Sequence, residues 1–487
     1  MSFHKMKFFW ITGAFFGLLF AVLFSVRMDL FRSKASHELE KGIVASTPAD
    51  RDSWMNIFQG GRKIGFSHTV FSKKEKGYDL KETVFMRINT LGMVQGLNLR
   101  TESVLNPDFT LSSIDFEISS GRFRFDAEGA VSGDTLSLKT KTRSSGDTRT
   151  IDIKLSKKPY LAAGIMYAAR AADAKPGDTF FFEIFDPATM SQGTADVNIL
   201  NKEEILNMGV IKSATKVTVS FKGATQMAWI GENGEVLKEE GLLGIILEKT
   251  TREDALSELA LESSQDLAQV ASVESNVRID DPLQLLLLKI EISGINYDNV
   301  HISGGRQTLE GNILLIHKES LSDIQTSQVP ENLKVFLEAT PFIQSDHKKI
   351  RNLVKEIVSP DDTPLEKAEK LMSWVYKNIE KRPVLSLPDA ISTLENRMGD
   401  CNEHAVLFAA LARAAGIPAK VEAGLVYLKG RFYYHAWNIL YLGNWITADS
   451  LFGQIPADVT HIRFATGEQQ LDLISIMGKV KLKIIGF

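Results

Sequence analysis

The stretch from Gly399 to Asp449 constrains the fold of this chain most, because it holds the only cysteine in the sequence. That residue, Cys401, stands directly ahead of an apolar run, residues 406–415, which predicts a helix. Asp400 is a candidate N-cap, so we expect the helix to begin at the thiol. A helix start and a nearby imidazolium from His435 both favour a thiolate, so the pattern predicts a lowered thiol pKa.

A pair of strands is predicted after this helix. His435 lies in an aromatic and branched run, residues 431–441, and a second run ends at Asp449. The turn between the two runs falls at residues 442–444. A three-residue turn puts Asp449 diagonal to His435 on the same face, whereas a two-residue turn puts it on the opposite face. A site that uses both residues therefore requires an odd-length loop or a bulge.

Cysteine, histidine and aspartate in this order are the parts of a covalent acyl-transfer site. We predict Cys401 as the nucleophile, His435 as the general base and Asp449 as the carboxylate that orients the imidazole. Each residue also has a plainer explanation, since a lone cysteine is usually a small buried hydrophobe and a histidine in an aromatic strand usually packs in the core. Their joint occurrence at a helix start, a strand centre and a strand end favours the catalytic interpretation.

The same stretch resembles the core of the transglutaminase-like superfamily, a group of papain-like cysteine enzymes built on a Cys-His-Asp triad. The resemblance covers roughly residues 350–467 and implies the same three roles for Cys401, His435 and Asp449. It implies cleavage or transfer of amide bonds through a thioester acyl-enzyme, on a protein, peptide or cell-wall peptide, with hydrolysis favoured over crosslinking. The matching segments are Arg397–Cys401, Leu411–Ala419, Tyr434–Trp437 and Trp445–Asp449, and residues 403–405, 449–454 and 460–463 resemble a bacterial, membrane-associated branch.

Stabilisation of a tetrahedral oxyanion is assigned only in part. The amide N–H of Cys401 is one donor, because it points from the helix start. Trp374 and Asn396 are candidates for the second donor, although Trp374 stands at helical spacing and is favoured as a core residue. His404, three residues after Cys401, shares its helix face. We expect His404 and His461 to be supporting or packing residues rather than competing bases.

Charge and motifs exclude several classes of function. The 56 basic and 60 acidic residues give a formal net charge of −4, so no basic field for nucleic acid is implied. The sequence shows no HExxH, no paired Cys-x-x-Cys, no P-loop and no GxGxxG before a helix. The acidic pairs at residues 280–281 and 361–362 lack calcium-loop spacing and are interpreted as turns or caps. We therefore expect no metal, no cofactor and no nucleic-acid partner.

The start of the chain predicts a membrane anchor. Residues 8–26 carry no charge and would span roughly 28 Å as a helix, about the thickness of a bilayer core. A cleaved signal peptide is the alternative, but the length of the segment and the charges that follow it favour an uncleaved anchor. We expect a single-pass protein of a bacterial inner membrane, with the bulk of the chain periplasmic or otherwise extracytoplasmic. A lone thiol outside the cytoplasm suits a catalyst better than a scaffold.

The rest of the sequence is rich in predicted strands. Runs with apolar alternation recur over residues 54–240 with a turn signal about every ten residues, which predicts antiparallel β structure. Residues 158–174 are expected to be helical. We predict an α+β fold class. The expected units are a membrane anchor (1–32), a linker (33–52), a β-rich domain (53–275), a small β-rich connecting domain (276–345) and a transglutaminase-like catalytic domain (346–487).

A non-catalytic function is the competing hypothesis. In it the chain is an envelope scaffold or a binding module for peptide, glycan or lipid, and the papain-like part only recognises peptides. A reactive thiol separates the two hypotheses, since a scaffold needs none.

Overall fold

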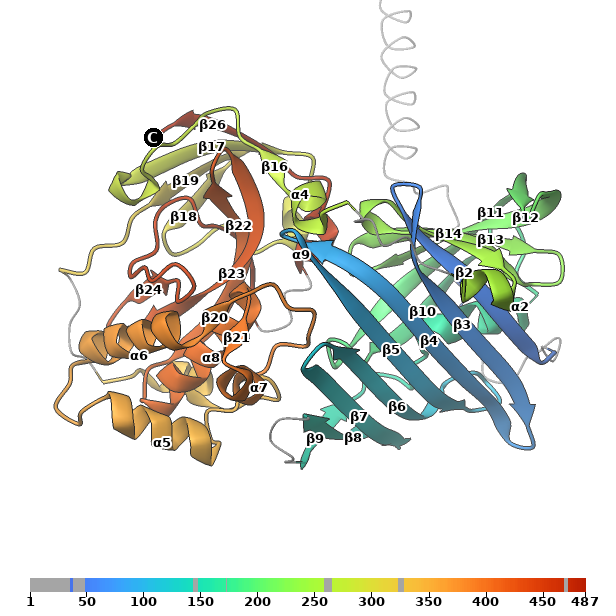
Figure 1. Ribbon diagram of the computed structural model, residues 1–487, viewed down its shortest axis with the longest axis horizontal. Helices are drawn as coiled ribbons and strands as arrows, with labels where there is room; N and C mark the ends of the chain where they lie inside the picture. The colour runs from blue at the N-terminus through green and yellow to red at the C-terminus, as the bar shows by residue number, and fades with distance from the viewer. Residues whose placement is uncertain are drawn as a thin grey trace, which may run out of the picture.

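The computed structural model describes residues 36–37, 49–142, 148–171, 173–257, 265–322, 328–467 and 472–487. Strands make up 49% of the described residues and helices 20%, and large antiparallel sheets dominate the fold (Figure 1). The predicted α+β class is therefore wrong, and the fold is mostly β. The helices around Cys401 are short, whereas the alternating runs over residues 51–250 form one continuous sheet.

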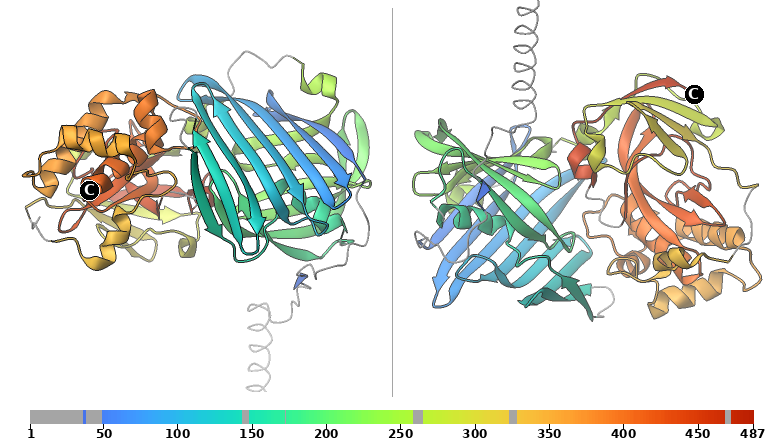
Figure 2. Two further views of the ribbon diagram at one scale, coloured as in Figure 1. Left: turned by 90° about the horizontal axis from the view of Figure 1, so that it is seen from below. Right: turned by 180° about the vertical axis from the view of Figure 1, so that it is seen from behind.

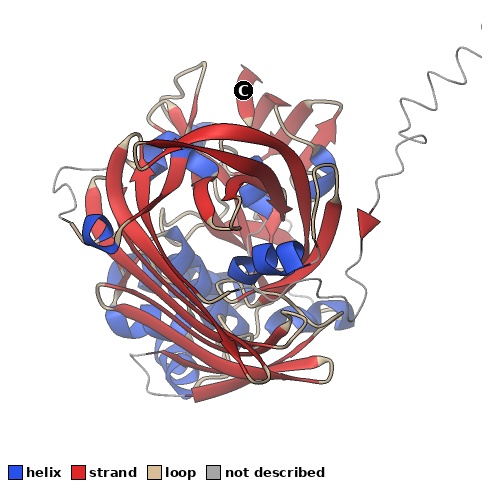
Figure 3. Ribbon diagram, turned by 90° about the vertical axis from the view of Figure 1, so that its right-hand side faces the viewer, coloured by secondary structure: helices blue, strands red, loops and turns tan. Residues whose placement is uncertain are grey.

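One sheet of 15 strands accounts for the first half of the described chain. It consists of two antiparallel meanders, β2 to β9 and β10 to β15, which join where β15 pairs with β2, and of β1, which pairs in parallel with β10. The sheet is strongly curved, and short helices lie on its inner side (Figure 3). Its strands are β1 (Ser36–His37), β2 (Arg51–Gln59), β3 (Arg62–Lys74), β4 (Gly77–Thr90), β5 (Met93–Leu105), β6 (Leu111–Ser120), β7 (Phe123–Ser132), β8 (Thr135–Thr142), β9 (Thr148–Lys154), β10 (Thr179–Asp186), β11 (Ser191–Asn207), β12 (Val210–Phe221), β13 (Ala224–Gly231), β14 (Val236–Glu240) and β15 (Ile245–Thr250).

Helix α2 (Ile165–Ala171) packs against the core of this sheet. The ring of Tyr167 stacks on Phe71 of β3, with 4.0 Å between centroids. The prediction of one helix over residues 158–174 is correct only in part, because Tyr160 forms a bridge to β10 before the helix begins. The other short helices of this half are η1 (Ala162–Gly164), η2 (Leu242–Gly244), α3 (Arg252–Ala255) and α4 (Leu267–Ala271).

A five-stranded sheet and four helices form the unit that carries Cys401. The helix predicted at Cys401 is confirmed, as is the strand predicted at residues 431–441. Asn438 of that strand donates to the carbonyl oxygen of Ala405 at 2.9 Å. This hydrogen bond holds the helix that begins at Cys401 against the sheet. The elements are α5 (Lys348–Ile357), α6 (Pro364–Asn378), β20 (Glu380–Lys381), α7 (Ala390–Asn396), β21 (Met398–Gly399), α8 (Cys401–Ala414), β22 (Ala419–Leu428), β23 (Arg431–Tyr441), β24 (Trp445–Ala448), β25 (Ile462–Thr466) and β16 (Val273–Glu274).

A four-stranded sheet packs beside this unit and includes the last strand of the chain. This last strand, β26, pairs with β17, where Ile484 lies opposite Ile290 and both side chains are buried. The chain end therefore joins this small sheet and not the large one. The elements are η3 (Pro282–Gln284), β17 (Leu287–Ser293), η4 (Tyr297–Asn299), β18 (Gln307–Glu310), β19 (Ile313–His317), η5 (Glu331–Leu337), α9 (Asp472–Ile476) and β26 (Lys481–Gly486).

The large sheet and the Cys401 unit lie side by side (Figure 2). Gln95 of β5 donates to the carbonyl oxygen of Pro383 at 2.9 Å, and Arg149 of β9 pairs with Asp346 at 3.0 Å. Buried side chains of both parts belong to one continuous hydrophobic cluster. Pro383 lies in the segment between β20 and α7. The large sheet therefore contacts the segment of the chain that precedes Cys401.

The predicted membrane anchor, residues 8–26, lies outside the described residues. Within the part of the chain that the structure describes, no helix is long and apolar enough to cross a membrane. The longest of these helices, α6, has 15 residues and carries several charges, and about 30 Å of hydrocarbon needs roughly 20 apolar residues. The prediction of a single-pass inner-membrane protein with an extracytoplasmic bulk is corrected on this finding.

Candidate active site

Cys401 is the first residue of α8, and a capping box sets its local geometry. The Asp400 carboxylate accepts from the N–H of Asn402 at 2.9 Å, and Glu403 in turn accepts from the N–H of Asp400 at 2.9 Å. Gly399 has no room for a side chain, because a Cβ there would lie 2.2 Å from the Cβ of Glu403. The predicted helix start is therefore confirmed. The Cys401 amide stands among the helix N–H groups that have no intrahelical acceptor.

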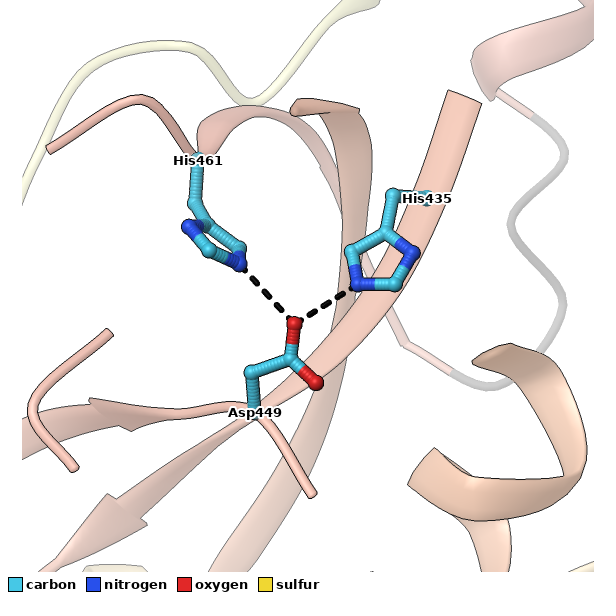
Figure 4. Close-up of side chains that lie close together, drawn as sticks. All are labelled: His435, Asp449 and His461. Atoms are coloured by element: carbon cyan, nitrogen blue, oxygen red, sulfur yellow. Dashed lines mark hydrogen bonds and ion pairs between the residues drawn. The ribbon is translucent and has the colours of Figure 1, made fainter. Parts of the chain in front are cut away.

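The strands that carry His435 and lead to Asp449 pair as the site requires. Tyr441 lies opposite Trp445, so the loop between the strands is the three residues 442–444. This register brings Nε2 of His435 to 2.7 Å from Oδ2 of Asp449 (Figure 4). The predicted odd-length loop is present, and the catalytic roles of the two residues are taken up below as a proposal.

The Asp449 carboxylate is saturated with donors. Its Oδ1 accepts from the N–H groups of Leu451 at 2.8 Å and Phe452 at 3.0 Å, and its Oδ2 accepts from His435 and from His461. Burial alone would raise the pKa of Asp449, but its contacts with the two imidazoles outweigh the effect of burial. They hold the pKa of this carboxyl well below its usual range, so Asp449 is an anion.

The Cys401 thiol lies beside the strand of His435, since its sulfur accepts a hydrogen bond from the N–H of Ala436. Burial raises the pKa of this thiol well above its usual value, and the carboxyls of Asp400 and Glu403 act in the same direction. The predicted lowering of the thiol pKa is therefore wrong for the resting site. These effects outweigh the N–H of Ala436, which acts on the thiol in the opposite direction. Use of Cys401 as a nucleophile requires that its proton pass to a base.

His461 bonds the same carboxylate oxygen as His435. Its Nε2 lies 2.9 Å from Oδ2 of Asp449, and its Nδ1 lies 3.2 Å from the carbonyl oxygen and 3.4 Å from Oδ1 of Asp458. The residue is 0% exposed and stands edge-on to Trp437, 5.2 Å between centroids. The sequence predicts only a supporting role here. Asp458 and His461 stand three residues apart in the loop between β24 and β25. This spacing is the sequence signal that could have shown Asp458 as the acidic partner of His461.

The loop at residues 457–461, which carries His461, is fixed from outside by Arg306. The Arg306 guanidinium donates to three carbonyl oxygens of the loop, at 2.7, 3.0 and 3.1 Å. It also pairs with Glu319 at 3.0 Å, and Glu319 accepts from the N–H of Thr447 at 3.0 Å. Both side chains of this ion pair are almost buried. The pair thus ties the His461 loop to β24, and no sequence motif marks it.

The other predicted residues lie in α6, α7 and α8. His404 is fully buried, its Nδ1 donates to the carbonyl oxygen of Asp400 at 2.7 Å, and burial lowers its pKa, which fits the expected supporting role. Trp374 packs at the edge of the core with the Arg397 guanidinium 4.7 Å from its ring. Among the described residues, Asn396 Nδ2 has no hydrogen-bond partner. The role of Asn396 as a second oxyanion donor stays a prediction.

The ring nitrogens of His435 and His461 and the carboxylate of Asp449 lie within 4.8 Å of one another, close enough to surround a metal ion. The contacts of 2.7 and 2.9 Å are, however, of hydrogen-bond length. Each of these atoms already has a partner of the opposite hydrogen-bonding type. We interpret the cluster as hydrogen-bonded and assign no metal to it.

Comparison with known proteins matches this part of the chain to a family model. Residues 351–450, which end one residue after Asp449, match the model of the transglutaminase-like superfamily. This part of the chain is a transglutaminase-like domain. The match covers Cys401, His435 and Asp449 and stops before His461.

The comparisons also found a similar curated protein and similar solved structures. An uncharacterised protein from Haemophilus influenzae is 36% identical over 108 residues, which are 21% of this chain and 28% of that protein, so the chain covers little more than a quarter of that relative. A candidate cysteine protease from Cytophaga hutchinsonii is 17% identical, with a TM-score of 0.27 over 40% of this chain and 83% of its own. A β-barrel-like protein of a domain of unknown function from Brucella abortus is 9% identical, with a TM-score of 0.32 over 42% and 95% of the two chains.

Proposed function

We propose that this protein is a cysteine enzyme that cleaves or transfers amide bonds, with Cys401, His435 and Asp449 as its catalytic residues. The observation that carries the proposal is the 2.7 Å hydrogen bond from Nε2 of His435 to Asp449. His435 lies on β23, and the N–H of the next residue on that strand, Ala436, bonds the Cys401 sulfur. This arrangement leaves Nδ1 of His435 as the ring nitrogen available to the thiol. The transglutaminase-like match over residues 351–450 supports the same assignment.

The first half-reaction forms a thioester. Nδ1 of His435 accepts the thiol proton as Sγ of Cys401 attacks the carbonyl carbon of the amide. The Cys401 amide N–H, at the start of α8, stabilises the charge that develops on the carbonyl oxygen. The C–N bond then breaks, and the leaving amine takes the proton from His435. Asp449 holds the imidazole in one orientation and stabilises it while it is charged.

The second half-reaction transfers the acyl group to an acceptor. His435 removes a proton from the acceptor, which attacks the thioester carbon, and the proton then returns to the departing Cys401 sulfur. Water as acceptor gives hydrolysis, and a primary amine gives a new amide bond. We favour hydrolysis of a protein, peptide or cell-wall peptide, because water is always present whereas transfer needs a second bound substrate.

Trapping of the acyl-enzyme tests this proposal. The full chain is incubated with a panel of peptide anilides and isopeptide-linked peptides, quenched in acid and analysed by intact-mass spectrometry. We expect release of the amine together with an acyl adduct on Cys401 in the wild type, and neither in Cys401→Ala. His68→Ala on the large sheet is the matched control, since that histidine pairs with Asp52 far from the site in sequence, and it should retain activity.

A labelled primary amine added to the same assay separates the two outcomes. Labelled product supports transfer, and its absence alongside amine release supports hydrolysis. A wild type that forms no adduct and releases no amine across the panel contradicts the proposal.

One observation favours a non-catalytic module as the second candidate. The Cys401 thiol is half-buried, and burial together with Asp400 raises its pKa, as in a structural cysteine. In this case the domain would recognise peptides without cleaving them. Cys401→Ala would then bind the same peptides with unchanged affinity, and the wild-type thiol would resist alkylation near neutral pH.

A further inference from the structure

The contacts of His461 determine its protonation state. Its Nε2 faces a carboxylate oxygen of Asp449 at 2.9 Å, and its Nδ1 faces the carbonyl oxygen and the carboxylate of Asp458 at 3.2 and 3.4 Å. All of these oxygens are acceptors, since a carbonyl and an ionised carboxylate carry no hydrogen. A neutral imidazole has one N–H and one lone pair, so one of its nitrogens would face an acceptor with a lone pair. Only the imidazolium donates on both sides.

The charges around His461 are consistent with a buried cation. Burial alone would lower the pKa of His461, but the hydrogen bonds and charges of Asp449 and Asp458 raise it to about 9. His461 holds the pKa of Asp458 well below its usual range in spite of burial, helped by hydrogen bonds from Thr460. The remaining charged groups near the loop are balanced in pairs, Arg306 with Glu319 and Arg463 with Glu422. From β23 and α8 the titratable side chains that approach Asp449 are His435, His404 and Cys401.

We infer that His461 is a positioning residue: a buried imidazolium that shares the Asp449 carboxylate with His435 and keeps His435 neutral, ready to accept the thiol proton. The inference rests on the proposed function only in giving His435 the role of base. His461 acts through Asp449, because its own contacts are to Asp449 and Asp458.

The charge balance explains the effect on His435. Asp449 alone would stabilise a proton on His435, as a carboxylate stabilises any neighbouring imidazolium. His461 already supplies one positive charge to the same oxygen, Oδ2, that His435 bonds. A second imidazolium there would face the first, with 5.8 Å between the ring centroids. Repulsion between like charges at this distance in a buried site disfavours the proton on His435. Asp449 can then orient His435 without holding it protonated.

The protonation of His461 can be observed directly. The full-length protein with ¹⁵N-labelled histidine is examined by two-bond ¹H–¹⁵N NMR, with the signals of the nine histidines assigned through single substitutions. We expect both ring nitrogens of His461 to be protonated at pH 7.5. Asp458→Asn, which leaves the ring in place and removes the acceptor charge, should lower the pH at which His461 loses its proton. A neutral His461 at pH 7.5 overturns the inference.

The effect on His435 is tested in a Cys401→Ala background, where no thiol titrates with it. His461→Gln keeps an N–H donor for Asp449 and removes the charge, so His435 should keep its proton to a higher pH than it does beside His461. An unchanged midpoint of the His435 titration shows a merely structural role and overturns the inference. If His461→Gln does not fold, the pH 7.5 spectrum of the wild-type ring still decides whether His461 is an imidazolium. Neither readout requires turnover, so an inert enzyme contradicts the proposed function and leaves this result standing.

Discussion

His435 and His461 donate to a single oxygen, Oδ2 of Asp449, at 2.7 and 2.9 Å. The three-residue loop between β23 and β24 brings the first histidine to this oxygen, and the Arg306-bound loop before β25 brings the second. Asp449 therefore orients one imidazole and neutralises the other. Its removal should affect both catalysis and stability.

Asp449→Asn tests this double role. The amide keeps the size of the side chain, but it offers one acceptor oxygen where the carboxylate accepts four hydrogen bonds from His435, His461, Leu451 and Phe452. We expect kcat/KM for an amide substrate to fall about 10³–10⁴-fold. The free energy of unfolding should fall by about 3–5 kcal/mol, because the buried charge of His461 loses its partner. Urea denaturation and steady-state kinetics measure the two effects, and a variant with wild-type stability would contradict a charged His461.

The charge of His461 predicts a specific dependence of stability on pH. The folded protein holds the His461 proton with a pKa of about 9, whereas the unfolded chain releases it near pH 6.5. The stabilisation is fully present below pH 6.5 and is lost as the pH rises through about 9, with a magnitude of about 3 kcal/mol. Urea denaturation from pH 6 to 10 should show this loss in the wild type and not in His461→Gln. Parallel curves for the two proteins would contradict it.

Gly399→Ala should disturb the nucleophile without touching any reacting group. The added methyl would lie 2.2 Å from the Cβ of Glu403, so the capping box or the start of α8 must move. We expect a loss of activity and a lower melting temperature. Gly241→Ala is the matched control, since its Cβ would meet other atoms only at 3.8 Å and beyond. Equal behaviour of the two variants would show that the close approach at Gly399 is unimportant.

The ion pair of Arg306 and Glu319 should be a major determinant of site stability. Arg306→Ala leaves the Glu319 carboxylate buried and frees the loop at residues 457–461, so we expect a loss of about 3–5 kcal/mol in unfolding free energy. Arg278→Ala, which breaks an exposed pair with Asp280, is the control and should have no measurable effect. Chemical denaturation compares them, and a silent Arg306→Ala would show that the loop is held by other contacts.

The parts of the site predicted from the sequence are those encoded locally. Asp400 marked the helix start, and the alternation of residues 431–441 with a three-residue turn gave the register of His435 and Asp449. The meander strands were found in the same way, because alternation and turn residues are features of neighbouring positions. The whole-chain class was wrong, since the share of strands depends on how the runs of residues 51–250 join into one sheet.

The parts that sequence reasoning missed depend on contacts between distant segments. Arg306 reaches the His461 loop across about 150 positions of the chain, and no periodicity reports such a contact. The sequence predicts the wrong direction for the thiol pKa, because the helix start alone does not reveal the burial of Cys401 or the closeness of the acidic groups around it. The predicted anchor at residues 8–26 lies outside the described residues. Among the residues that the structure describes, no helix is long and apolar enough to cross a membrane.

The central claim is that His435 activates a thiol that its surroundings would otherwise keep protonated. Cys401 is the only cysteine of the chain, so the rate of alkylation by iodoacetamide reports on it alone. The measurement is this rate as a function of pH in the wild type and in His435→Ala. Near pH 7 the wild type should react at least about 10²-fold faster than the variant.

The variant should titrate above the free-thiol value of about 8.5, because burial and the carboxyl of Asp400 raise the pKa of the thiol. Two coincident curves, both titrating like a free thiol, would contradict the account and favour the non-catalytic module.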